Sequence, residues 1–177
     1  MRQPAVLRRN SAVLISLDGT QMDTFASLDA LSSEFFREFA RCEYCLKAVG
    51  LREPKRRDPT ADWGAFAGQV QSVFDHPPSQ EVADAIHYYL NTPPKKQVVR
   101  NSLLDWEASE PAHKNQAELV LRLVCRVRNN LFHGGKFNGH WFEPQRSEEL
   151  LRHGLAVLRA VVSAHPSVRE AYAQRAV

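Results

Sequence analysis

The residues of this chain best suited to chemistry lie in one short stretch, Arg128-Asn129-Asn130-Leu131-Phe132-His133. An arginine stays charged and can hold a phosphate through two hydrogen bonds, and a histidine titrates near neutrality. The two amides between them can orient either group. Gly134, Gly135 and Lys136 follow at once, and glycines there predict the end of a helix. The stretch therefore predicts an anion-binding site at a helix end.

A helix from Lys114 to Phe132 is expected to carry this stretch. Its apolar residues alternate at spacings of three and four, the pattern of a helix with one buried face: Ala117, Val120, Val124, Val127 and Leu131. The opposite face is basic and polar, with no carboxylate after Glu118, and holds Arg122, Arg126, Asn129 and His133. Such a face can follow a phosphate backbone.

Arg128 lies on the edge of the apolar stripe, on a flank shared with Leu121, Cys125 and Phe132. That flank is apolar enough to meet another helix, and an arginine there needs an anionic or carbonyl partner. On an unbroken helix, Arg128 and His133 point about 140° apart, so they cannot hold one phosphate. They converge if the helix unwinds near the glycines, or if a two-fold dimer packed along this flank supplies a second copy.

Two arginines and two histidines around one cleft suit the cleavage of RNA by its own 2′-hydroxyl. The reaction needs a base for the hydroxyl proton, an acid for the leaving 5′-oxygen, and cations beside the phosphate. Histidine can serve as base or acid, and arginine can bind the phosphate. The predicted substrate is therefore RNA, and the predicted reaction uses neither metal nor cofactor.

The stretch from Arg128 to His133 resembles the R-x(4–6)-H motif of the HEPN superfamily of small helical proteins, including the polar residue after the arginine. The resemblance implies an α-helical homodimer and a metal-independent endoribonuclease with a composite site at the dimer interface. It implies that Arg128 stabilises the phosphate, that His133 is the acid or base, and that Asn129 orients them. We assign RNA contacts to four polar residues around them: Arg122, Arg126, Asn130 and Lys136.

Many members of this superfamily belong to toxin–antitoxin or anti-phage defence systems, so the resemblance implies a protein antitoxin as a further partner. One subgroup often has a tyrosine, modified by a nucleotidyltransferase antitoxin, two residues after the histidine. This chain has Gly135 there. Other members are non-catalytic, and the alternative function is a HEPN-like module that binds a protein partner or RNA. Binding of a small nucleotide in the same cleft is a third hypothesis.

The elements that position the motif are predicted to form an all-α, HEPN-like bundle of five or six helices. Apolar spacing predicts a long helix from Phe25 to Val49 with Gly50 as its C-cap. Further helices of the bundle are expected from Thr60 or Asp62 to about His76, from Ser79 to Asn91, from Pro93-Pro94 through Trp106, from Lys114 to Phe132, and from about Ser147 to His165. A short basic tail helix from Ser167 is expected to follow the bundle. Asn138-Gly139 between aromatic residues predicts a tight turn or small hairpin.

Length and composition suit one folded domain, with 177 residues of which 44% are hydrophobic and 24% charged. Residues 1–24 are expected to form an N-terminal arm, in which 12–17 fits a short strand, and residues 25–177 the helical domain. The apolar runs are far shorter than the ~20 residues that cross a bilayer. Without a secretory signal, the three cysteines favour free thiols in the cytoplasm. The net charge of +3 permits RNA as a partner without requiring it.

Two further patterns favour structural interpretations. Cys42 and Cys45 form a C-x-x-C pair with no second pair, so we interpret them as core residues of a helix and not as a zinc site. The three tryptophans, Trp63, Trp106 and Trp141, fit core or interface anchors better than base-stacking platforms, and only Trp141 is close enough in sequence to the motif to stack there.

Overall fold

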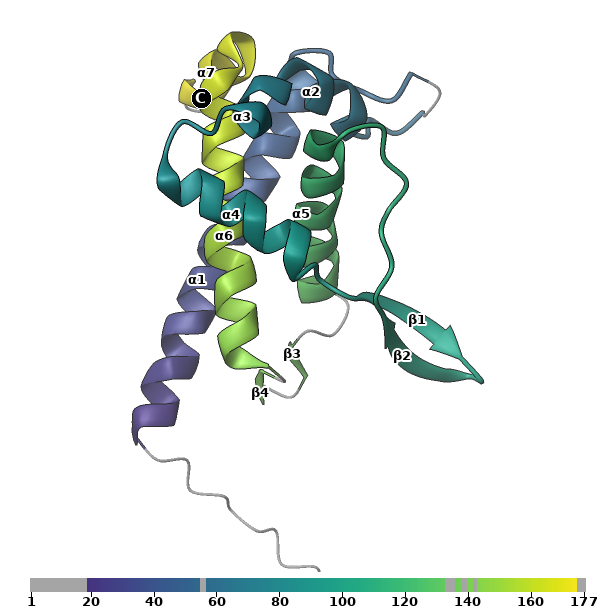
Figure 1. Ribbon diagram of the computed structural model, residues 1–177. Helices are drawn as coiled ribbons and strands as arrows, with labels where there is room; N and C mark the ends of the chain where they lie inside the picture. The colour runs from purple at the N-terminus through teal and green to yellow at the C-terminus, as the bar shows by residue number, and fades with distance from the viewer. Residues whose placement is uncertain (1–18, 55–56, 133–135, 138–139, 142, 175–177) are drawn as a thin grey trace, which may run out of the picture.

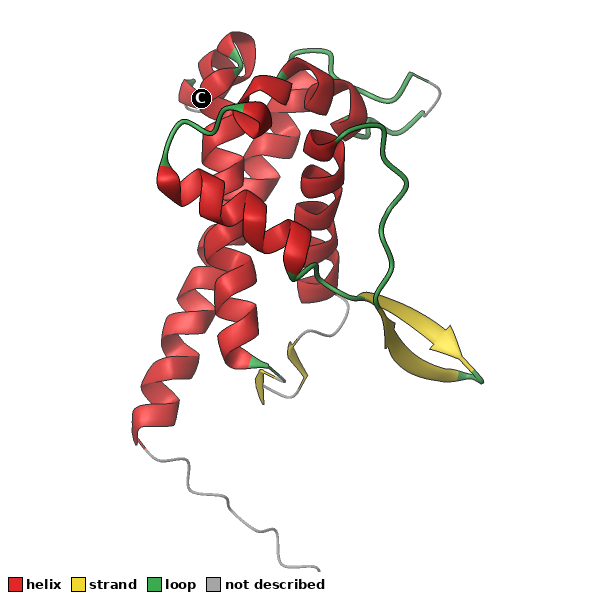
Figure 2. Ribbon diagram, in the orientation of Figure 1, coloured by secondary structure: helices red, strands yellow, loops and turns green. Residues whose placement is uncertain are grey.

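The computed structural model describes residues 19–54, 57–132, 136–137, 140–141 and 143–174. This part of the chain is mostly helical, as predicted, with seven helices and two small antiparallel hairpins (Figures 1 and 2). The helices are α1 (Gly19–Ala48), α2 (Trp63–Gln69), α3 (Gln71–Asp75), α4 (Gln80–Asn91), α5 (Gln116–Phe132), α6 (Pro144–Ala164) and α7 (Pro166–Ala173). The hairpins are β1 (Lys96–Arg100) with β2 (Leu103–Glu107), and β3 (Lys136–Phe137) with β4 (His140–Trp141).

The core lies where α1, α4, α5 and α6 meet. In Figure 1, α1 and α6 run side by side along the molecule, α4 crosses α6, and α5 stands beside them. The side chains at their centre are almost completely buried and include Phe35, Phe39, Tyr89, Leu121 and Leu158. Cys42 and Cys45 of α1 are 0% and 1% exposed, which confirms that they are core residues. No helix in the described part of the chain is long and apolar enough to cross a bilayer.

Helix α1 ends as the sequence predicts. Gly50 has a φ of +91°, which a residue without a side chain adopts at little cost, and Leu51 N–H donates to Leu46 O at 2.9 Å. The start differs from the prediction, because α1 begins at Gly19 and therefore includes six residues that we assigned to the N-terminal arm. The expected strand at 12–17 lies outside the described residues.

Two other helices also begin close to their predicted caps. The Ser79 hydroxyl accepts from Val82 N–H at 3.3 Å at the start of α4, and the Asp62 carboxylate accepts from Ala65 N–H at 2.8 Å at the start of α2. The single helix expected from Asp62 to about His76 is divided at Val70 into α2 and α3. Helix α6 starts at Pro144, earlier than expected, with proline in a first turn where its missing N–H costs no bond.

The prediction of a helix from Pro93-Pro94 through Trp106 is wrong, because this segment forms the β1–β2 hairpin. The hairpin projects from the bundle (Figure 2). Its two-residue turn, Asn101-Ser102, has φ values of 52° and 63°, as the twist of a tight hairpin requires. On one face Arg100 forms ion pairs with Asp105 and Glu107. The small hairpin predicted around Asn138-Gly139 is confirmed by the pairing of β3 with β4.

The close approach of α6 to α1 and α4 depends on Gly154. A Cβ atom there would lie 2.6 Å from Phe35 Cε2 and 2.8 Å from Tyr89 Oη, and Phe35 is fully buried. The Tyr89 hydroxyl also donates to Leu150 O at 2.7 Å, which fixes that ring against α6. Neither ring can move aside without disturbing the core.

We predict that Gly154→Ala lowers the free energy of unfolding by about 1–3 kcal/mol, because the methyl group overpacks this crossing. Urea unfolding followed by circular dichroism measures the change. Gly68→Ala is the matched control, since nothing lies within 4 Å of its Cβ position in α2 and alanine is the better helix former. Equal stability of the two variants would contradict the prediction.

Candidate functional site

Helix α5 presents the apolar face that the sequence predicts. Ala117, Val120 and Val124 are 0% exposed and Val127 is 4% exposed, and Leu131 packs partly buried against the same core. The helix ends at Phe132, so Arg128, Asn129 and Asn130 lie in its last two turns. His133 follows the helix directly but lies outside the described residues, and of Lys136 only its place at the start of β3 is described.

The flank on which we expected a dimer to pack is partly buried within the chain, and Arg128 on it contacts α1. Leu121 is 0% exposed within the single chain, and burial raises the pKa of the Cys125 thiol to about 12. Arg128, on the same flank, contacts two residues of α1. Leu121 itself cannot contact a partner subunit in this fold, because its side chain is already buried. Dimerisation along the rest of this flank, through Cys125, Arg128 and Phe132, stays a prediction.

Arg128 forms an ion pair with the carboxylate of Glu43, which agrees with the expectation that an arginine on this flank needs an anionic or carbonyl partner. Its Nη2 lies 3.5 Å from Glu43 Oε2, and its guanidinium carbon lies 4.9 Å from the centre of the Phe39 ring. The ion pair is longer than the 2.7–2.9 Å typical of strong charged hydrogen bonds. The side chain is 32% exposed, and its buried Nε has no hydrogen-bond partner in the described part of the chain. The exposed part of the guanidinium can therefore still donate hydrogen bonds to a ligand, whereas the buried Nε cannot be reached from solvent.

Arg128 and Asn129 line a cleft of about 680 Å³, which we call the motif cleft. Its α5 wall contains five of the seven residues that the sequence assigned to the site: Arg122, Arg126, Arg128, Asn129 and Asn130. Glu43 of α1, Trp63 of α2 and Lys96 of β1 belong to the other walls. The sequence prediction missed Glu43 as the partner of Arg128, because its spacing on α1 gives no sign of which helix it meets.

The electrostatics of the motif cleft are mixed. Its lining contains four basic residues and three acidic ones, namely Lys96, Arg122, Arg126, Arg128, Glu43, Glu53 and Glu110. A small excess of positive charge, in a site with several guanidinium groups, favours a phosphate over a cationic ligand. Among the residues that the structure describes, no group of three or more His, Cys, Asp or Glu side chains could hold a metal ion.

Two residues predicted to contact RNA hold the base of the β1–β2 hairpin. Arg126 Nη1 donates to Ser109 O at 2.5 Å and to Pro94 O at 3.1 Å, and burial lowers the pKa of its guanidinium. Asn130 Nδ2 donates to Lys95 O at 2.9 Å. These donors are occupied by backbone carbonyls, so within the described structure both side chains position the hairpin.

Arg122 is anchored by a buried carboxylate. Glu118 is 4% exposed and accepts from Arg122 Nη2 at 2.6 Å, Arg122 Nε at 2.9 Å and Lys114 N–H at 2.9 Å. Burial by itself raises the pKa of the Glu118 carboxyl, but the hydrogen bonds from Arg122 and Lys114 outweigh it and hold the pKa below its ordinary value. The 43% exposed Arg122 side chain is thereby fixed on the wall of the motif cleft.

Comparisons of this chain with protein-family models, with curated proteins and with solved structures found no match. The relation to the HEPN superfamily therefore remains the resemblance carried by Arg128, Asn129 and His133.

We predict that Glu118→Gln lowers the free energy of unfolding at pH 7 by about 1–3 kcal/mol, because hydrogen bonds to a buried charge are lost. The pKa of the Glu118 carboxyl is lower in the folded state than its ordinary value of 4.5, so the carboxylate stabilises the fold at pH values above 4.5. This stabilisation is lost as the pH falls from 4.5 through the lower folded-state pKa. The difference between wild type and variant should therefore shrink in acid. Urea unfolding at several pH values measures it.

The control for this prediction is Glu148→Gln, which removes an exposed carboxylate from another i,i+4 pair, with Arg152. That variant should lose less than about 1 kcal/mol, as exposed ion pairs do. A Glu118→Gln variant as stable as this control at pH 7 would contradict the assigned role.

We predict that Arg126→Gln releases the β1–β2 hairpin from α5 and leaves the bundle folded, because two backbone carbonyls lose their shared donor. Hydrogen exchange at the amides of β1 and β2 should accelerate by about tenfold or more, while exchange in α1 and α6 changes much less. Arg100→Gln, which breaks only exposed ion pairs within the hairpin, is the control. Unchanged hydrogen exchange at the hairpin amides in Arg126→Gln would show that Arg126 does not hold the hairpin on α5.

Proposed function

We propose that this protein is a metal-independent endoribonuclease of the HEPN type, acting as a homodimer in a toxin–antitoxin or anti-phage defence system. The observation that carries the proposal is that Arg128 and Asn129 line one cleft at the end of α5, directly before His133. A cleft rich in guanidinium groups suits a phosphate backbone, and a histidine such as His133, which follows α5 in the sequence, can supply the proton transfers of RNA cleavage.

In the proposed reaction, His133 takes the proton from the 2′-hydroxyl of the ribose, and the 2′-oxygen attacks the adjacent phosphorus. The bond from phosphorus to the 5′-oxygen breaks, and that oxygen receives a proton from the second His133 of the dimer. The products are a 2′,3′-cyclic phosphate and a free 5′-hydroxyl. Arg128 stabilises the charge on the phosphate in the transition state, and Asn129 orients the reacting groups.

The contacts of Arg128 support this role in two ways. Phe39 and Glu43 hold its side chain in place, so little conformational entropy is lost when it binds a phosphate. The Glu43 ion pair is loose at 3.5 Å, so a phosphate oxygen can compete for the guanidinium. Exposed Asn129 lies beside it on the same cleft. Arg122, held by Glu118, would then contact a neighbouring phosphate.

We predict that the purified protein cleaves single-stranded RNA in EDTA, and that His133→Ala and Arg128→Ala each reduce the cleavage rate by about 100-fold or more. Gel assays with end-labelled RNA measure the rate, and end mapping identifies the 2′,3′-cyclic phosphate. Arg152→Ala is the matched control, because that arginine also pairs with a glutamate but lies on α6, outside the motif cleft.

Circular dichroism and urea unfolding must show that each variant is folded. Because Arg128 also packs on α1, Arg128→Lys provides a second variant that keeps the charge and loses the bidentate geometry, and it should still cleave poorly. Cleavage that survives both alanine substitutions, or that appears only after Mg²⁺ is added, would falsify the proposed mechanism.

The second candidate function is a non-catalytic helical module that binds RNA or a protein partner. The observation in its favour is that Arg128, Arg126 and Asn130 all make contacts within the chain that also stabilise the fold. This alternative predicts that no RNA is cut under any metal condition, and that Arg128→Ala affects stability or partner binding alone. The assay above separates the two functions.

A further inference from the structure

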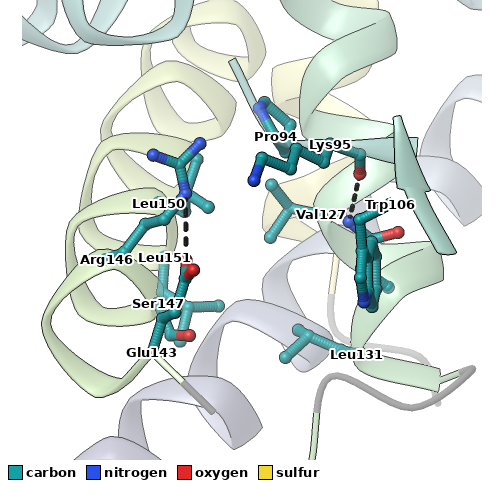
Figure 3. A pocket seen from close by; sticks show the side chains of 11 residues that line it. Pro94, Lys95, Trp106, Val127, Leu131, Glu143, Arg146, Ser147, Leu150 and Leu151 are labelled. Carbon is teal, nitrogen blue, oxygen red and sulfur yellow. Dashed lines mark hydrogen bonds and ion pairs between the residues drawn. The ribbon is translucent and has the colours of Figure 1, made fainter. Parts of the chain in front are cut away.

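A second hollow lies between α5, the base of the hairpin and the start of α6 (Figure 3), and shares Asn130 with the motif cleft. Its volume is about 350 Å³, within the range of pockets that enclose small ligands. We call it the Trp106 pocket, and its lining is Pro94, Lys95, Trp106, Val127, Asn130, Leu131, Glu143, Arg146, Ser147, Leu150 and Leu151.

The walls of the Trp106 pocket are mainly apolar, and one of them is aromatic. Val127 and Leu131 of α5 face Leu150 and Leu151 of α6 across it, as Figure 3 shows. The Trp106 side of the pocket belongs to β2, and Trp106 is 39% exposed. We expected this tryptophan to be a core or interface anchor, but the projecting hairpin leaves part of its ring open. A flat apolar ring system could stack there.

One end of the Trp106 pocket is positively charged. Lys95 and Arg146 extend toward each other across it in Figure 3. Arg146 is held in place because its Nη2 donates to Pro93 O at 2.8 Å and its Nε lies 3.5 Å from Glu143 Oε2. Two basic groups and one carboxylate leave this end with a positive charge that attracts an anion. Ser147 and Asn130 add groups that can hydrogen bond to a polar edge.

From these features we propose that the Trp106 pocket binds a nucleobase, stacked on Trp106, whose attached phosphate lies between Lys95 and Arg146. A flat ring joined to an anion matches the aromatic wall and the basic end together, whereas an apolar side chain of a protein would leave both cations unused. The same chemistry is found in a free nucleoside monophosphate and in one nucleotide of an RNA strand.

The position of the pocket favours the RNA strand, and this part of the inference rests on the proposed function. Asn130 lines both the Trp106 pocket and the motif cleft. The two successive lysines at the start of the hairpin line different hollows, Lys95 the pocket and Lys96 the cleft. A strand that crosses the hairpin base can therefore place one phosphate beside Arg128 and a nearby base on Trp106, which would select the base next to the cut.

The test measures binding separately from cleavage. AMP and a 2′-O-methylated hexamer of adenosine, which lacks the attacking hydroxyl, are titrated against the full chain by isothermal calorimetry and fluorescence anisotropy. Trp106→Ala should weaken binding of the hexamer by about tenfold or more, since loss of a stacking ring typically costs about 5- to 150-fold. Ser147→Phe, which fills the pocket and removes none of its charges, should have the same effect.

Matched controls isolate the pocket. Arg152→Gln changes an arginine on α6 that does not line the pocket, and Leu103→Ala changes a 71% exposed apolar residue of the same hairpin. Both should bind as wild type does, and urea unfolding must show that all variants are folded. If AMP binding falls with hexamer binding, the pocket accepts free nucleotides too; if only the hexamer is affected, it reads a base within a strand. Both results support the inference.

Absence of binding by both probes, or binding that Trp106→Ala and Ser147→Phe leave unchanged, would overturn the inference. Occupation of the pocket by an apolar side chain of a protein partner would give the first of these results. The proposed function fails independently: wild-type protein that binds the hexamer through the pocket but never cuts unmodified RNA refutes the nuclease and leaves the nucleotide site. Protein that cuts RNA, with base choice unchanged in Trp106→Ala, refutes the base-selecting role.

Discussion

The arrangement of both hollows depends on one side chain, Arg126. Its guanidinium donates to the carbonyl of Pro94 just before β1 and to that of Ser109 just after β2. A two-stranded hairpin has little stability by itself in water, so its direction is set by what holds its ends. By joining both ends to α5, Arg126 positions the hairpin base, whose residues line both the motif cleft and the Trp106 pocket.

The three faces of helix α5 make different contacts. Its apolar face fills the core, its flank carries Arg128 onto α1, and its polar face holds the hairpin and lines the motif cleft. All three arginines on the helix are therefore already paired with a carboxylate or a carbonyl. The charge available to a ligand is smaller than the sequence suggests, and it is concentrated near Arg128, whose side chain is partly exposed and whose ion pair is long.

The features that the sequence predicted are those set by local contacts. Helix α5, the Ser79 cap of α4 and the Gly50 end of α1 each follow from residues within a few positions of one another. The β1–β2 hairpin was mistaken for a helix because its turn, Asn101-Ser102, lacks the glycine that usually marks such turns. Its position depends on Arg126, which is distant in sequence.

In the candidate site too, the sequence predicted what lies within one helix and did not predict the contacts between separate elements. Periodicity on α5 predicted that Arg122, Arg126 and Asn129 share a face, and all three line the motif cleft. It could not identify Glu43 as the partner of Arg128, or the carbonyls that occupy Arg126 and Asn130, because these contacts join separate elements. Trp106 was missed for the same reason, since its exposure follows from a hairpin that was not expected.

Because Cys42 and Cys45 of α1 are buried, the rate of their chemical modification measures how often the fold opens around them. Alkylating reagents attack thiolates, and burial both shields Cys42 and raises the pKa of its thiol. Cys45, 1% exposed, is shielded as well. Modification of either sulfur therefore requires α1 to separate from its neighbours, and the labelling rate gives the free energy of that separation. Cys125, which is partly exposed and lines the motif cleft, reports instead on access to that cleft.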